Sequence, residues 1–428
     1  MAYSPSSPNQ LRSAWLIWGL AATFYFSDYM ARVAPGVMHR ALQLDFGMNE
    51  VGFATLTSFF YIPYILMQIP VGLTVDRIKI RYLLTIMSLI TAVGCCVFGA
   101  ANGLPMASFA RLLIGFSAAF AFISALRLAT SWFPPAMLGL LAGLTQALGM
   151  MGASAGQAPL SFLVSAVGWR NSMYIVSIFF VVLAALLFKY IQDKPITAEL
   201  SNEALTKPKI NILQSLRIVL SSRQTWINAL YAGFLYGPTA VIGEAIGPAY
   251  LEYGRGLSSH AAAFATGLIF IGWVFGGPLV GYLSDRIGRR KPCMIISALC
   301  GMVLTTLFVF YPHMSRNLAY VLFFVFGLTN SGVAIAYAVS TELHGRRVIG
   351  TAIAFTNMMS IFIGASLQPL VGHLVDRVSG VRAFHVETLL LSDFQYGLRI
   401  LPISSLIAFI LAILVKETYC KPILDETV

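Results

Sequence analysis

The sequence predicts an all-α polytopic membrane protein, with twelve transmembrane helices in two six-helix bundles related by a pseudo-twofold repeat. Of its 428 residues 58% are apolar and only 11% are charged, whereas soluble domains carry about 25% charged residues. Lipid must therefore cover most of the surface. At about 20 apolar residues per crossing, the chain has room for about a dozen spans. Two similar ten-residue segments, at 72–81 and 281–290, support a division into two bundles.

Apolar runs separated by Gly, Pro and charged residues mark the individual helices. The predicted spans are 13–37, 51–73, 82–101, 106–132, 138–166 and 170–191, followed by 224–248, 259–283, 292–311, 317–341, 348–374 and 396–416. One long polar stretch divides them six and six. We therefore expect an N-terminal bundle at 1–191, a cytoplasmic linker at 192–223 and a C-terminal bundle at 224–428.

The distribution of Lys and Arg predicts the orientation. With both termini in the cytoplasm, eighteen of the 28 basic residues fall on the inner side and seven on the outer side, which is the positive-inside pattern. We expect a multi-pass protein of a bacterial inner membrane, whose first span is not cleaved. This bias explains the basic net charge without a nucleic-acid partner.

Two segment pairs repeat at nearly one spacing. Asp76 and Asp285 occupy similar sequences, 72–81 and 281–290, and lie 209 residues apart. Residues 139–157 likewise resemble 350–368 at a spacing of 211. A tandem duplication of six helices predicts a parallel-repeat transporter, with its site between the halves at the membrane midplane.

Ionisable residues within spans are costly and usually face a cavity or a partner. Asp28 and Arg32 are four residues apart, so they share a helix face and can pair; Tyr25 lies on the same face. The pair is either a self-neutralised pair or an anion-binding arginine held by its aspartate. Arginine suits an anion site because its guanidinium binds a carboxylate through two parallel hydrogen bonds.

Glu244 is the first candidate for a proton carrier. Gly237-Pro238 and Gly247-Pro248 flank it, and two such pairs predict a broken helix that lines a cavity. It also lies near the repeat mate of Arg32, and no local cation is evident. A carboxylate at the outer mouth without a special role is the alternative.

Further polar residues within spans are weaker candidates. Arg127 either faces the cavity or extends to the cytoplasmic interface, and it lies about 160° around its helix from Arg111. Gln146 and Asn357 occupy repeat-equivalent places, where they contact either substrate or a neighbouring helix. Tyr236 suits packing or binding.

Residues 281–290 read Gly-Tyr-Leu-Ser-Asp-Arg-Ile-Gly-Arg-Arg and resemble the signature loop of the major facilitator superfamily. The 72–81 copy departs from the pattern, because Lys79 replaces the glycine and Ile80 the first of the paired arginines. The resemblance implies alternating access and a gating motif on the inner side. Its residues are Gly72, Asp76, Arg77, Arg81, Gly281, Asp285, Arg286 and Arg290.

The sequences of spans 1 and 4 resemble particular branches of this superfamily. Residues 29–35, and Arg127 ahead of Ser-Trp-Phe-Pro-Pro at 131–135, are similar to the organic-anion symporter branch and to intraphagosomal amino-acid permeases. This implies that Arg32 and Arg127 bind substrate carboxylates. Residues 111–115 resemble a span-4 motif that implies a part in proton coupling for Arg111, although an anchor at the outer interface is an equal alternative. Ala31 stands where the branch often has an acidic residue, and Asp28 replaces it one turn earlier.

The predicted function is proton-coupled uptake of a small carboxylate-bearing solute, an amino acid or an organic acid. A substrate carboxylate competes for Arg32 and frees Asp28 to take a proton; Glu244 can serve the same purpose. The alternatives are a proton-coupled exporter of drugs or metabolites and a permease for a carboxylate siderophore. The partners are solute, protons and lipid, and we expect a monomer.

An enzyme is not expected. The six histidines lie in loops or near helix ends, with no ligand spacing typical of a metal site, and no nucleophile–base cluster is evident. The sequence predicts neither a cofactor nor a metal.

Overall fold

The structure is a computed structural model, and it describes residues 8–133, 137–192, 212–345 and 348–421. The N-terminal half is entirely helical within these ranges. Its elements are α1 (Pro8–Val33), η1 (Ala34–Met38), α2 (His39–Phe46), α3 (Glu50–Ser58), α4 (Tyr61–Arg77), α5 (Ile80–Gly99), α6 (Leu104–Trp132), α7 (Leu138–Ala155) and α8 (Ala158–Tyr190).

The C-terminal half follows the same plan and begins with a short amphipathic helix. Its elements are α10 (Ile212–Ser221), α11 (Arg223–Pro238), η3 (Thr239–Ile246), α12 (Gly247–Ala249), η4 (Tyr250–Gly254), α13 (Ser259–Ile287), α14 (Lys291–Phe310), α15 (Arg316–Asn330), α16 (Val333–Glu342), α17 (Ile349–Ser379), η5 (Gly380–Phe384), η6 (Val386–Thr388), α18 (Leu391–Leu398) and α19 (Ile400–Leu414).

The twelve predicted helices are all present. Among the described residues, nine segments are long and apolar enough to cross a membrane. One of them, Leu141–Tyr190, holds two crossings, because Gly168 in α8 has φ +81° and breaks the helix there. The first and seventh crossings, α1 and α11 through η4, complete the set. Several spans combine two helices, as α3 and α4 do on either side of Phe59 and Phe60.

The duplication is visible in the packing. A Cβ on Gly115 of α6 would lie 1.9 Å from the carbonyl oxygen of Phe60, and one on Gly327 of α15 would lie 1.9 Å from that of Ile269. The two glycines are 212 residues apart and the two carbonyls are 209 apart. In both halves, therefore, a glycine lets the fourth helix pack directly on the backbone of the second.

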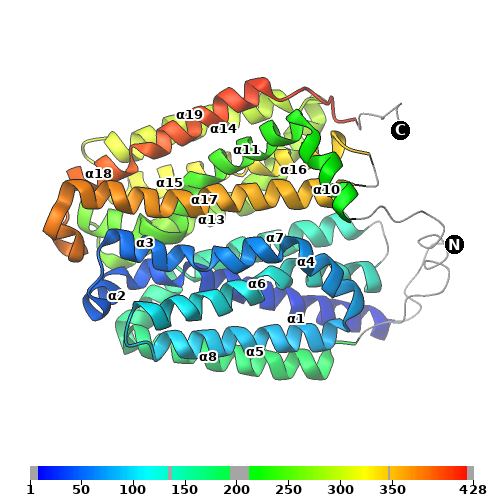
Figure 1. Cartoon of the computed structure of the whole chain (residues 1–428), viewed down its shortest axis with the longest axis horizontal. Coiled ribbons are helices and arrows are strands. Elements are labelled where there is room, and N and C mark those ends of the chain that lie inside the picture. The colour runs from blue at the N-terminus through cyan, green and yellow to red at the C-terminus, as the bar shows by residue number, and fades with distance from the viewer. Residues whose placement is uncertain (1–7, 134–136, 193–211, 346–347, 422–428) are drawn as a thin grey trace.

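The molecule has two ends, which Figure 1 shows at opposite sides of the bundles. We call one the termini end: α1 begins there, and the loops after α4 and α13 lie there. The other, which we call the distal end, carries α2 and the segment from Gly380 to Thr388. The two bundles lie side by side, with α3 packed against α17 and α7 against α13.

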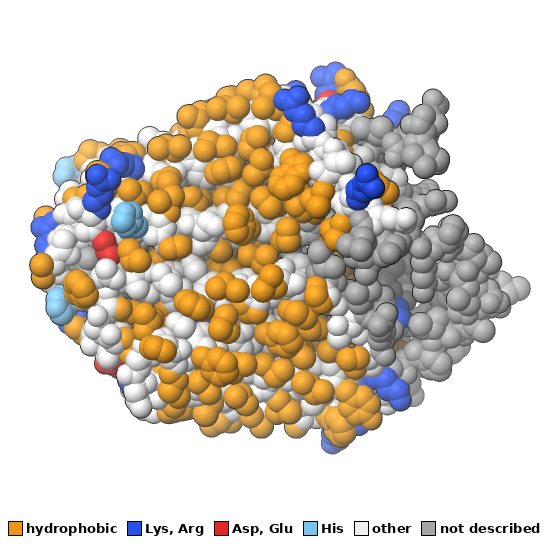
Figure 2. Space-filling model, viewed as in Figure 1, with side chains coloured by type: hydrophobic (Ala, Val, Ile, Leu, Met, Phe, Trp, Pro, Cys, Tyr) orange, Lys and Arg blue, Asp and Glu red, His pale blue; other side chains and the backbone are white. Residues whose placement is uncertain are grey.

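The surface matches a lipid environment. Figure 2 shows hydrophobic side chains over the middle of the visible face, with Lys and Arg toward its two ends. Large apolar side chains such as Leu66, Ile178 and Tyr282 are more than 60% exposed. The chain is a multi-pass membrane protein in which lipid, rather than a protein core, covers these residues.

Candidate functional site

An ion pair joins the two bundles at the centre of the molecule. Arg32, in the last turn of α1, places Nε 3.5 Å from Oε2 of Glu244 in η3, and both side chains are 2% exposed. The predicted pairing of Arg32 with Asp28 is therefore wrong, and so is the expectation that Glu244 lacks a cation. Spacing along one helix brings two side chains near each other, but the packed partner helix decides which ions meet.

Aromatic rings surround the Arg32 guanidinium. Its carbon lies 4.9 Å from the ring centre of Tyr29, 5.3 Å from Phe60, 5.0 Å from Tyr61 and 5.5 Å from Tyr64. Cation–π contacts of this kind stabilise a charge that has lost its water. Two donors remain unused, since Nε and Nη2 of Arg32 make no hydrogen bond to the described residues.

Tyrosine hydroxyls from both bundles hold the Glu244 carboxylate. Tyr236 of α11 donates to Oε1, and Tyr61 of α4 donates to Oε2. The sequence leaves packing and substrate binding open for Tyr236; in this structure its hydroxyl contacts the carboxylate, and substrate binding by Tyr236 stays a prediction. Glu244, Arg32 and the two tyrosines thus form one buried unit that spans the bundle interface.

The predicted break in the seventh span takes the form of a π-helix. Residues Thr239–Ile246 are π-helical and lie between the two Gly-Pro pairs. Proline lacks an N–H donor and disturbs the regular helical hydrogen bonds, and π-helical turns often occur at functional sites. Gln157 of the other bundle donates to the carbonyl of Gly243 at 2.8 Å, which holds this segment against the N-terminal half.

Gln368 of α17 connects the same elements. It accepts a hydrogen bond from Thr57 at 2.8 Å, and it donates to the Ala240 carbonyl at 3.0 Å and to the Tyr61 hydroxyl at 3.4 Å. Its described hydrogen bonds are all to other helices.

Arg111 of α6 supports the end of α1. It donates to the carbonyls of Ala31 at 3.0 Å, Arg32 at 2.9 Å and Thr57 at 3.5 Å, and it is 2% exposed. The last carbonyls of a helix lack partners within it, and a cation there also interacts favourably with the negative end of the helix dipole. These contacts replace the predicted anchor at the outer interface, while the part in proton coupling stays a prediction.

Asp28 lies inside the N-terminal bundle. Thr91 of α5 donates to its Oδ1 at 3.5 Å, and Oδ2 has no hydrogen-bond partner among the described residues. Arg32 points across the interface, whereas Asp28 points into its own half. Its predicted role as a proton carrier is untested by this arrangement.

Polar contacts connect both repeat-equivalent amides, Gln146 and Asn357, to the tyrosine rings around Arg32. The Tyr25 hydroxyl, which has a single proton, lies 3.3 Å from Oε1 of Gln146 and 3.4 Å from the Tyr29 hydroxyl. Tyr29 in turn stacks over Arg32.

On the other side, Asn357 accepts from Tyr337 at 3.0 Å and donates to Gln68 at 3.1 Å. Gln68 donates to the carbonyl of Tyr64 at 3.4 Å, and the Tyr64 ring faces Arg32. Hydrogen-bonding groups from both halves therefore extend outward from the central pair.

Arg127 lies elsewhere on α6. It is half-buried, and its 16-residue separation from Arg111 corresponds to about 24 Å of helix. Because Arg111 contacts the end of α1, Arg127 lies well toward the termini end from Arg32. Its predicted binding of substrate remains a prediction.

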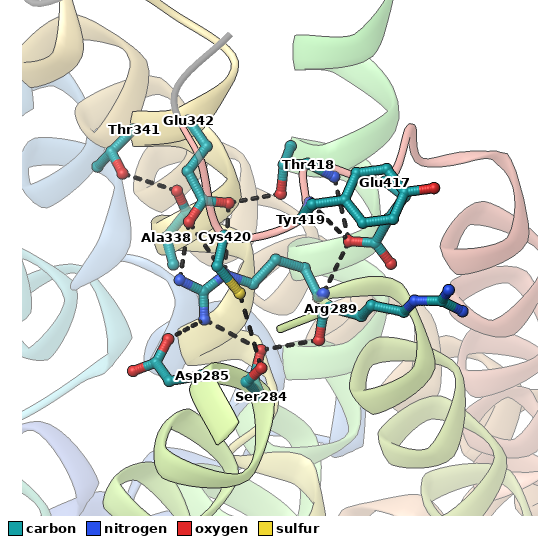
Figure 3. Close-up of polar contacts among 11 residues, drawn as sticks. Ser284, Asp285, Arg289, Ala338, Thr341, Glu342, Glu417, Thr418, Tyr419 and Cys420 are labelled. Carbon is teal, nitrogen blue, oxygen red and sulfur yellow. Dashed lines mark hydrogen bonds and ion pairs between the residues drawn. The ribbon is translucent and has the colours of Figure 1, made fainter. Parts of the chain in front are cut away.

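The C-terminal copy of the motif forms a second ion cluster at the termini end (Figure 3). Arg290 pairs with Asp285 at 2.6 Å and with Glu342 at 2.7 Å, and its Nη1 also donates to Ser284 at 3.0 Å. Burial alone lowers the pKa of Arg290, but its hydrogen bonds to Glu342 and Asp285 outweigh this and raise the pKa above the ordinary value. Gly288 ends α13 in the left-handed region, with φ +70°.

The chain after α19 completes this cluster. Glu417 accepts from the backbone N–H groups of Arg290 at 2.8 Å and Lys291 at 3.1 Å, so it caps α14. Thr418 donates to Glu342 at 2.5 Å. Glu342 is the last residue of α16.

The two copies of the motif differ. Asp285 and Arg286 are exposed and Gly281 is half-buried, but the side chains of Asp76 and Arg77, like Gly72, lie outside the described part of α4. Lys79 has φ −58° rather than the left-handed turn of Gly288, as expected without glycine there.

The guanidinium of Arg81 lies 4.2 Å from the ring centre of Phe188 in α8. The gating role of both motif copies stays a prediction.

Comparisons with known proteins identify the family. The model of the Major Facilitator Superfamily matches residues 17–369. The chain is 25% identical over 390 residues to a probable sulfoacetate transporter of Cupriavidus necator, covering 86% of this chain and 89% of that one. It is 22% identical over 391 residues to a probable hexose phosphate transport protein of Chlamydia muridarum, covering 83% and 85%.

A solved structure has the same fold. A bacterial homologue of the human lysosomal transporter Spinster superposes with a TM-score of 0.74 at 15% identity, covering 96% of this chain and 97% of that one. With twelve helices in two repeated bundles and a buried ion pair between them, the chain is a membrane transporter and not an enzyme, and it belongs to the major facilitator superfamily.

Proposed function

We propose that the protein takes up a small organic anion together with protons by alternating access between its two bundles. The observation that carries the proposal is Arg32, which is buried between the bundles and has two donor nitrogens, Nε and Nη2, without a hydrogen-bond partner among the described residues. A carboxylate, sulfonate or phosphate presents two oxygens that match this fork. A buried N–H group without a hydrogen-bond partner costs free energy. An anionic ligand that accepts hydrogen bonds from these groups removes that cost.

The relatives support the same chemistry. Sulfoacetate carries a sulfonate and a carboxylate, and a hexose phosphate carries a phosphate. An anionic group on a small polar molecule is common to both. In this chain hydrogen bonds connect Gln146 to Tyr25, and Asn357 through Gln68 to Tyr64, and both amides suit the uncharged polar part of such a solute. An organic acid is the substrate class favoured here.

Glu244 provides the coupling. Its carboxylate occupies the place beside Arg32 that a substrate anion needs, so the two compete for one cation. The Arg32–Glu244 pair is formally neutral, and an anion that displaces Glu244 leaves an uncompensated negative charge in a buried site. A proton on Glu244 removes that charge. Anion and proton therefore load together.

The orientation follows the distribution of basic residues. The termini end lies in the cytoplasm of a bacterial cell, and the distal end faces outward. Residues 1–191 and 224–428 are the two moving units, joined by the linker at 192–223, and one chain forms the functional unit.

Uptake into proteoliposomes tests the proposal. A pool of organic acids, sulfonates, sugar phosphates, amino acids and carboxylate chelates is offered with and without an inward proton gradient, and uptake is read by mass spectrometry. We expect gradient-dependent uptake of one anion class by wild type and by the exposed control Arg316→Lys, and its loss in Arg32→Lys.

Glu244→Gln separates binding from coupling. This variant should still exchange labelled solute across the membrane but should no longer accumulate it against a gradient. Clearance of cationic or apolar compounds from preloaded vesicles, without uptake of any anion, would instead establish an exporter. Uptake restricted to chelates would establish the siderophore permease.

A further inference from the structure

The distal end carries a second inter-bundle contact, built on a third copy of the glycine–aspartate motif. Residues 372–377, near the end of α17, read Gly-His-Leu-Val-Asp-Arg. They repeat the Gly-x-x-x-Asp-Arg order of 72–77 and 281–286 at the opposite end of the molecule. Gly380 follows α17 with φ +56°, so a glycine with positive φ ends this helix too.

Asp376 caps a helix of the other bundle. Its Oδ1 accepts from the backbone N–H of Glu50 at 3.1 Å, and its Oδ2 accepts from that of Val51 at 3.3 Å and from Nδ2 of Asn49 at 2.5 Å. These groups form the N-terminus of α3. A carboxylate there accepts hydrogen bonds from the free N–H groups and interacts favourably with the positive end of the helix dipole.

Gly372 makes this contact possible. A Cβ at this position would lie 2.7 Å from the carbonyl oxygen of Glu50 and 3.1 Å from the Cβ of Ala54. The backbones of α17 and α3 therefore touch one turn before Asp376 (Figure 1). A larger residue would separate the helices and withdraw the carboxylate from the cap.

The cap is one half of a symmetric contact. Subtracting the repeat spacing of 211 from 372 and 376 gives Ser161 and Ser165 in α8, and adding 209 to Val51 gives His260 in α13. Ser161 lies 3.3 Å from Nδ1 of His260, and Phe162 stacks on the same ring with centres 3.9 Å apart. Equivalent positions thus meet on both sides of the pseudo-twofold axis, and Ser165 stands where α17 has Asp376.

Neighbouring polar groups order the α3 side of the cap. Glu50 is fully buried and accepts from Gln43 at 2.6 Å and from His39 at 3.0 Å. Gln43 also accepts from the backbone N–H of Val386 in the C-terminal half, at 2.8 Å. The contacts of Glu50 with Gln43 and His39 lie within the N-terminal half and order the tip of α3, whereas the bond from Val386 is a further contact between the bundles.

We infer that Gly372 and Asp376 form a latch that closes the distal end, and that it must open for the transporter to expose its site there. In this structure the three hydrogen bonds to Asp376 are formed, so the latch is closed. Opening the distal end separates α3 from α17, so every cycle breaks the three hydrogen bonds to Asp376. The inference depends on alternating access but not on the identity of the solute.

Spin-label distances test the latch. In a variant whose five cysteines are replaced, labels at Leu44→Cys and Val381→Cys report on the distal end, and labels at Lys189→Cys and Lys416→Cys on the termini end; all four positions are exposed. Asp376→Asn and Gly372→Val should each shift the ratio of open to closed distal ends about tenfold toward open, from the typical effect of a lost cap.

The matched control is Asp45→Asn. Asp45 lies at the same end and pairs with Arg170 at 3.0 Å and with Trp169 at 2.9 Å, all within the N-terminal bundle. We expect its distance distributions to match wild type. Unchanged distal distances in both Asp376→Asn and Gly372→Val would overturn the latch, whether or not the proposed anion is transported. An equal opening in Asp45→Asn would overturn it too, since the effect would then be general loosening.

Discussion

The central and terminal ion clusters both rest on a buried arginine, but they use it in opposite ways. Arg290 directs Nε and Nη2 at Glu342 and Nη1 at Asp285 and Ser284. All of these partners belong to the C-terminal half. Arg32 has one carboxylate, Glu244 at 3.5 Å, supplied by the other bundle, and it leaves two donors unused among the described residues.

The difference indicates how to recognise a binding arginine in a helical membrane protein. A guanidinium whose donors are all used within one bundle holds loops and helix ends together. A guanidinium that faces rings and a single displaceable carboxylate across a moving interface retains the capacity to bind an anion. Substitutions in the two clusters should therefore affect different measurements.

The largest effect is expected at the central arginine. Arg32→Lys keeps the charge but loses the planar fork, and loss of a buried charged contact typically costs about 2–5 kcal/mol. We expect about a 100-fold lower kcat/KM for uptake, with an unchanged melting temperature in detergent. A parallel fall in melting temperature would show that Arg32 is structural, like Arg290.

Glu342→Gln should show the reverse pattern. It keeps an acceptor for Arg290 but removes the charge, so we expect the free energy of unfolding to fall by about 2 kcal/mol, below the 3–5 kcal/mol of a fully broken buried pair. Thermal unfolding in detergent measures this change, and KM should match wild type. A raised KM without loss of stability would contradict the division between the clusters.

Tyr236→Phe tests the role of the Arg32 cluster in a different way, because this variant should bind the transported anion more tightly than wild type. The variant removes one donor to the Glu244 carboxylate, a contribution of about 1 kcal/mol, and so weakens the internal competitor for Arg32. Equilibrium binding of the transported anion should become about fivefold tighter. If binding weakens instead, the Tyr236 hydroxyl contacts the solute directly, as the sequence predicts for this residue.

The smallest effect is expected at Glu417. Glu417→Gln weakens the cap on α14 while retaining the acceptor, and charges near helix ends contribute about 0.3–1 kcal/mol. We expect a melting temperature lower by about 1–2 °C, with uptake unchanged. A change in transport rate would show that the chain after α19 takes part in the cycle.

The crossings could be predicted from the sequence because lipid imposes them. Every span must be long, apolar and helical. Apolar runs bounded by Gly, Pro or charged residues are therefore enough to locate helices such as α5, α6 and α14. The break at Thr239–Ile246 was also predictable, since proline acts on its own helix. In each case the signal and the structure lie in the same stretch of chain.

The partners within the site could not be predicted in this way. Arg32 and Asp28 share a helix face, but contact with the other bundle turns Arg32 toward Glu244, 212 residues away. The repeat spacing placed Glu244 near the site without showing that the two residues pair. Asp376 had a readable signal, the Gly-x-x-x-Asp-Arg order, but it occurs at the opposite end from the other two copies.

The π-helix that carries Glu244 has a mechanical consequence. A π-helical turn holds one more residue than an α-helical turn, so conversion of Thr239–Ile246 to α-helix would rotate everything beyond it by about 100° and lengthen it by about 1.5 Å. Glu244 lies within this segment, so its carboxylate would turn away from Arg32. The π-helical winding of this one segment therefore sets the direction in which Glu244 faces.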